Sequence, residues 1–97
     1  MSLGAPGGLQ DATDEVKALA KEMKAETEKQ LGATYNEFEA VKFRKQIVNG
    51  TNFFIKVKVG PEQYVHLKVY QKLPCNGGAK ELSEAKGGQT LAAPIEF

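Results

Sequence analysis

A helical repeat of apolar residues occupies the first third of the chain. Apolar side chains recur there at spacings of three and four residues, at Val16, Leu19, Ala20, Met23 and Leu31. Thr13 is positioned as an N-cap, two acidic residues follow it, and Gly32 provides a stop signal. The pattern therefore predicts one helix over residues 13–31. Thr27 interrupts the apolar stripe, so the last two turns are expected to pack less tightly.

Two segments in the second half alternate between apolar and polar positions, which is typical of strands with one buried face. These segments are residues 53–59 and 64–73, and turn residues at 60–63 join them. Their apolar positions are Phe53, Ile55, Val57, Val59, Val65, Leu67 and Val69. The opposite positions carry mainly lysines together with His66, which the alternation predicts to lie on the solvated face.

The remaining strand signals are weaker. Residues 39–48 alternate imperfectly and change phase near Ala40, which indicates a β-bulge. Residues 75–90 are a mixed polar segment without a clear pattern. The final run 95–97 is expected to be at most a short edge strand, because Pro94 cannot donate a ladder hydrogen bond. The chain is therefore predicted to be an α+β protein, with one amphipathic helix packed on an antiparallel meander.

Meander geometry brings distant segments to one edge of the sheet. If three successive strands run up, down and up, the turn at Asn49 and the turn after Leu73 lie at the same end. An N-terminal arm paired antiparallel to the strand that ends at Val48 would bring Gly4 to this end too. The residues expected at this edge are unusually apolar: Leu3, Ala5, Pro6, Ile47, Val48, Leu73 and Pro74. They indicate either a partner surface or strand ends whose side chains turn inward.

Composition limits the classes of function. The chain has 97 residues and a net charge of +1, so it fits a single domain and has no global field that would attract nucleic acid or an anionic membrane. Residues 1–10 read as a flexible trunk of that domain. Neither a signal sequence nor a membrane-spanning run is recognisable, and Cys75 is the single cysteine. We therefore expect a protein that is not secreted, and no metal or other cofactor.

Two functions of other classes are open to the chain but weakly indicated. An enzyme would have to use Cys75 with His66, yet neither lies in a nucleophile motif and no orienting group is evident. A surface for single-stranded nucleic acid could form on the outward sheet face. Its residues would be Lys42, Arg44, Lys56, Lys58, Lys68 and Lys72, with Phe54, Tyr64 and Tyr70. The near-neutral charge and the lack of an RNA-binding motif speak against it, so no nucleic-acid partner is expected.

Three stretches resemble the cystatin superfamily, and specifically its stefin branch. They are GAP at 4–6, QIVNGTNFFIKVKVG at 46–60 and VHLKVYQKLP at 65–74. The resemblance covers nearly the whole chain in register. It implies a five-stranded antiparallel sheet wrapped around one long helix. It also implies a cytoplasmic, reversible, tight-binding inhibitor of papain-like cysteine proteases such as cathepsins. We expect a monomer, and opening of the first hairpin could exchange strands between two chains and form a domain-swapped dimer.

The resemblance also assigns residues to the protease contact. The family's N-terminal trunk and two hairpins form a wedge that fills the active-site cleft. Carried over to this chain, the wedge consists of Gly4, Gln46, Ile47, Val48, Asn49, Gly50, Leu73 and Pro74. The family's first hairpin usually reads Gln-Val-Val-Ala-Gly, so Ile47 and Asn49 are departures. Asn49 is expected to leave inhibition in place, but either weaker or with altered selectivity among proteases.

Overall fold

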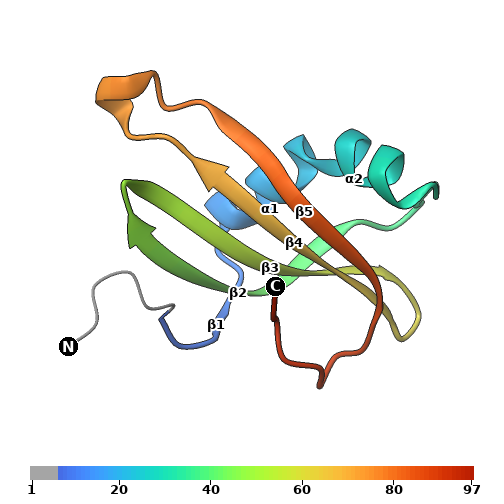
Figure 1. Cartoon of the computed structure of the whole chain (residues 1–97). Helices are drawn as coiled ribbons and strands as arrows, with labels where there is room; N and C mark the ends of the chain where they lie inside the picture. The colour runs from blue at the N-terminus through green and yellow to red at the C-terminus, as the bar shows by residue number, and fades with distance from the viewer. Residues whose placement is uncertain (1–6) are drawn as a thin grey trace.

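The structure is a computed structural model that describes residues 7–97, except for the side chain of Asn76. Its elements in chain order are β1 (Gln10–Asp11), α1 (Asp14–Glu22), α2 (Lys24–Leu31), β2 (Glu39–Val48), β3 (Gly50–Gly60), β4 (Gln63–Gln71), the 3₁₀ turn η1 (Pro74–Asn76) and β5 (Lys80–Gln89) (Figure 1). The strands of this part of the chain form one antiparallel sheet in the order β1-β2-β3-β4-β5. The α+β fold predicted from the sequence is confirmed.

The helical segment begins and ends where the sequence indicates, but it is interrupted at Met23. The hydroxyl of Thr13 accepts a hydrogen bond from the amide of Val16 at 3.2 Å, and Gly32 ends the segment with a φ of 65°. The single long helix expected over 13–31 is instead two helices, α1 and α2. The buried hydroxyl of Thr27 donates to the carbonyl of Met23 at 2.8 Å. The Met23 amide is shared between the carbonyls of Ala20 and Leu19, at 3.0 and 3.3 Å, so the break is a tightened turn at this residue.

The sheet follows the predicted meander but extends beyond it. The expected β-bulge is present between Ala40 and Lys42. The fifth strand, β5, lies in the polar segment that the pattern left unassigned, whereas the run 95–97 forms no strand. Irregular registers between β4 and β5 break the alternation that would have identified β5. Among helices formed by residues 7–97, none is long and apolar enough to cross a bilayer.

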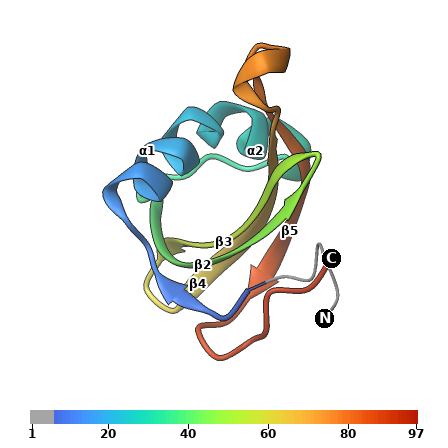
Figure 2. The same cartoon turned by 90° about the vertical axis from the view of Figure 1, so that its left-hand side faces the viewer.

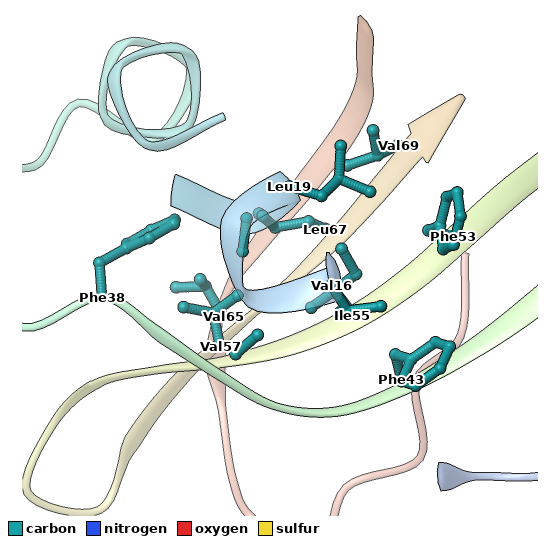
Figure 3. Packing of buried hydrophobic residues seen from close by; sticks show 12 residues of the cluster. Val16, Leu19, Phe38, Phe43, Phe53, Ile55, Val57, Val65, Leu67 and Val69 are labelled. Carbon is teal, nitrogen blue, oxygen red and sulfur yellow. The ribbon is translucent and has the colours of Figure 1, made fainter. Parts of the chain in front are cut away.

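The core lies between α1 and the inner face of the sheet. Figure 2 shows the helices on the concave side of the curved sheet, and Figure 3 shows Val16 and Leu19 of α1 packed among side chains from β2, β3 and β4. The sheet contributes Ala40, Phe43, Phe53, Ile55, Val57, Val65, Leu67 and Val69, and the loop before β2 contributes Phe38. Burying one face of three strands fixes their register, since a slip of one residue would expose the entire apolar set.

The C-terminal segment, residues 90–97, covers part of the opposite sheet face (Figure 2). The ammonium of Lys56 donates to the carbonyls of Thr90, Leu91 and Ala93 at 2.5, 2.7 and 2.7 Å. As a result, Lys56 and His66 are each 1% exposed. The prediction that His66 lies on a solvated face is therefore wrong. Strand alternation identified its face correctly but could not show that another segment covers it.

Candidate functional site

The β2–β3 hairpin ends in a tight tip with exposed apolar side chains. Val48 pairs with Gly50, so Asn49 alone stands outside the ladder, and Gly50 has a φ of 115°. Ile47 is 60% exposed and Val48 is 43% exposed. Phe43, four residues before Ile47, is buried in the core, so the core ends before the hairpin does. The sequence left open whether the apolar side chains at this edge are exposed or turn inward. At Ile47 and Val48 the structure contradicts the inward orientation.

The loop after β4 lies on the same side of the molecule as this hairpin tip, whereas the turn between β3 and β4 lies on the opposite side (Figure 1). Leu73 is half-buried, and the exposed Pro74 begins η1. The loop is closed by backbone hydrogen bonds from Gly78 to Leu73 at 3.0 Å and from Lys72 to Ala79 at 2.8 Å. Its apolar residues are thus presented from a loop with internal hydrogen bonds.

The N-terminal arm also runs toward the hairpin tip. Gln10 and Asp11 pair antiparallel with β2, and the amide of Gly7 donates to the carbonyl of Lys45 at 2.9 Å. Arg44 adds a hydrogen bond from Nε to the Gly7 carbonyl at 2.9 Å. The direction of the arm therefore agrees with the predicted meander geometry. Gly4 and its apolar neighbours Leu3, Ala5 and Pro6 lie outside the described residues.

Cys75 and His66 do not form a joint site. Cys75 is exposed in η1, whereas His66 is buried beneath the C-terminal segment. Burial, with added repulsion from Lys56 and Lys86, lowers the pKa of His66 to about 4. Burial also lowers the pKa of Lys56. Within residues 7–97 no cluster of three possible metal ligands is present.

The candidate nucleic-acid surface is less accessible than the sequence suggested. Lys56 is buried under the C-terminal segment, and Tyr64 is 9% exposed with its ring 5.8 Å from the Lys56 ammonium. Lys42 is engaged with the carboxylate of Asp11, which lowers the pKa of that carboxyl through their hydrogen bond and charge attraction. This candidate set of basic and aromatic side chains is therefore only partly exposed.

The structure adds two residues to the surroundings of the tip that sequence reasoning missed. Asn52 donates from Nδ2 to Oε1 of Gln46 at 3.2 Å, and the hydroxyl of Tyr70 donates to the backbone carbonyl of Asn49. Both hydrogen bonds depend on strand register, since Gln46 pairs with Asn52 and Asn52 pairs with Tyr70. Alternation did place Tyr70 on the outward face, but it carried no signal of a contact with the tip.

The curved antiparallel sheet with helices on its concave face, and the shared end of two loops, are features of the cystatin fold. The family model described as Cystatin domain matches residues 4–92, and the chain therefore belongs to the cystatin family.

The stefin resemblance is likewise confirmed by individual relatives. The chain is 41% identical over 87 residues to Cystatin-B of Oplegnathus fasciatus, covering 90% of this chain and 87% of that protein. It is 45% identical over 74 residues to human Cystatin-B, covering 76% of each chain. It is also 43% identical over 81 residues to Cystatin-A1 of Sus scrofa, covering 80% of this chain and 79% of that protein.

Proposed function

We propose that this protein is a reversible inhibitor of papain-like cysteine proteases that occludes the active-site cleft. The observation that carries the proposal is the pair of exposed apolar side chains, Ile47 and Val48, at the tip of an ordered hairpin in a cystatin-family chain. Apolar residues on such a tip gain free energy when a cleft removes them from water. A tip that is already ordered loses little conformational entropy on docking.

The proposed wedge has three parts. The first is the hairpin from Gln46 to Gly50, the second is the loop at Leu73 and Pro74, and the third is the trunk that includes Gly4. Protease–inhibitor interfaces typically bury about 1,600 Å² in total, which three short segments can supply between them. Because the wedge fills the cleft without a scissile bond aligned for attack, inhibition requires no reaction by this chain.

A titration of papain with matched variants tests the proposal. Ile47→Asp places a charge at the tip and should raise the inhibition constant by roughly tenfold or more, because a buried charge replaces a buried apolar group. Leu91→Asp is the control, since Leu91 is 58% exposed, nearly as much as Ile47 at 60%, but lies in the C-terminal segment. Full papain activity at a stoichiometric excess of the wild-type protein would refute the function. Equal effects of the two variants would refute the site.

The trunk and Asn49 have separate tests. Removal of residues 1–4 should weaken inhibition, and unchanged affinity would confine the wedge to the two hairpin loops. Asn49→Ala restores the residue usual in the family, and we expect inhibition constants against several cathepsins to change unequally. Equal constants for wild type and variant against all of them would remove the selectivity role of Asn49.

A further inference from the structure

A polar row crosses three strands directly behind the tip of the first hairpin. Gln46, Asn52 and Tyr70 occupy matched register positions on β2, β3 and β4. The Asn52 side chain donates to Gln46 at 3.2 Å, and the Tyr70 hydroxyl reaches beyond the row to donate to the carbonyl of Asn49. Since β4 leads into the loop at Leu73, Tyr70 links the strand that carries the second loop to the tip of the first.

The backbone at Gly50 independently shows how closely the tip packs against β4. A Cβ atom added to Gly50 would lie 2.6 Å from the Tyr70 hydroxyl oxygen and 2.6 Å from the carbonyl oxygen of Gln71. Separations this short are steric clashes, so only a residue without a side chain fits beside Tyr70. The tip is thus confined on one side by β4, while its apolar side chains remain exposed.

The end of a two-stranded hairpin is ordinarily where strands fray, because the last residues have few packing partners. Asn49 is the one tip residue outside the strand pairing, and Tyr70 supplies a hydrogen-bond donor to its carbonyl. A neighbouring strand therefore restrains the tip at its least supported point.

We propose that Tyr70 is a positioning residue for protease inhibition, because its hydroxyl holds the first hairpin tip in the binding conformation before a protease arrives. This inference rests on the function proposed above. Holding the tip in advance reduces the conformational entropy lost on binding. One neutral hydrogen bond of ordinary net strength corresponds to a change in affinity of about 2-fold to 10-fold.

Tyr70→Phe removes only the hydroxyl, and Tyr64→Phe is the matched control on the same strand, near the opposite turn. We expect Tyr70→Phe to raise the inhibition constant for papain by about 2-fold to 10-fold and to lower the thermal midpoint by a few degrees, because the same hydrogen bond stabilises the folded protein. Amide hydrogen exchange should become faster at residues 48–51. Tyr64→Phe should change neither inhibition nor tip exchange.

A second variant separates the proposed backbone contact from an effect of the Asn49 side chain. Asn49→Ala keeps the carbonyl that accepts from Tyr70, so Tyr70→Phe should weaken inhibition by the same factor in this background. Weaker inhibition without faster tip exchange would overturn the positioning role, because the hydroxyl would then contact the protease directly. Equal inhibition by wild type and Tyr70→Phe would overturn the role while leaving the proposed function standing. A wild-type protein that leaves papain active would overturn both.

Discussion

Because His66 is buried in its neutral form, lowering the pH from 7 to 5 should reduce the free energy of unfolding. His66 on β4 is paired in register with Lys56 on β3 and Lys86 on β5, so three basic residues form a row across the sheet. The side chain is 1% exposed, and among the described residues its Nε2 has no hydrogen-bond partner. A proton on His66 would place a third positive charge between two others in a site without a compensating acceptor.

The direction and size of the effect follow from the two pKa values. The pKa of His66 is 6.5 when unperturbed and falls to about 4 in the folded protein. The unfolded chain therefore binds the proton first, so stability is complete above pH 6.5 and is lost as the pH falls toward 4. The total loss is about 3 kcal/mol, of which about 2 kcal/mol falls between pH 7 and pH 5.

Urea unfolding at pH 7 and pH 5 measures this loss directly. Wild type should lose about 2 kcal/mol between these values, whereas His66→Leu, which fills a similar volume without titrating, should lose less than about 0.5 kcal/mol. Acidic groups contribute equally to both proteins and cancel in the comparison. His66 is the chain's single histidine, so its pKa can also be read from one NMR signal. A measured pKa of 6.5 or above, or equal losses in the two proteins, would refute the reasoning.

Three further substitutions test the fold. Leu67→Ala empties a fully buried position and should lower the free energy of unfolding by about 2–5 kcal/mol, and a loss below 1 kcal/mol in urea unfolding would contradict the packing described. Thr13→Ala removes the cap of α1 and should lower the free energy of unfolding by about 0.5–2 kcal/mol in the same assay. An unchanged free energy of unfolding would show that this cap does not stabilise the helix. Lys56→Met removes the donor to three carbonyls and should speed amide exchange in residues 90–97. The control Lys58→Met should leave this exchange unchanged. Equal exchange rates in the two variants would show that Lys56 does not hold the segment.

The elements near the candidate site were predictable because their signals are local. Alternation over residues 53–59 fixes which side chains enter the core, and an antiparallel meander places the loops at Asn49 and Leu73 at the same end without knowledge of any contact. The exposure of Ile47 could not be settled in this way. It depends on where the helical layer stops covering the sheet, which is a property of the packed structure.

The strand β5 and the break at Met23 were beyond local reasoning for a different physical reason. Within β5 only Leu82 and Ala85 pack partly against the core, and bulges shift the register, so its sequence lacks a regular period. At Met23 the apolar spacing suits a continuous helix. The Thr27 hydroxyl bonds to the Met23 carbonyl, a contact that often bends helices, and a threonine within an apolar stripe does not by itself reveal its rotamer.

Lys56 and Tyr70 show what alternation leaves undetermined on the outward face of a strand. The period of two assigns both side chains to that face, but it does not say which groups lie opposite them. Lys56 meets three carbonyls from a segment more than thirty residues later, and Tyr70 meets a carbonyl in the hairpin tip. Backbone carbonyls occur at every residue, so the sequence does not indicate which of them will accept a hydrogen bond from a given side chain. The contact of Lys56 restrains the C-terminal segment, and the contact of Tyr70 restrains the hairpin tip. Both contacts are visible only in the folded structure.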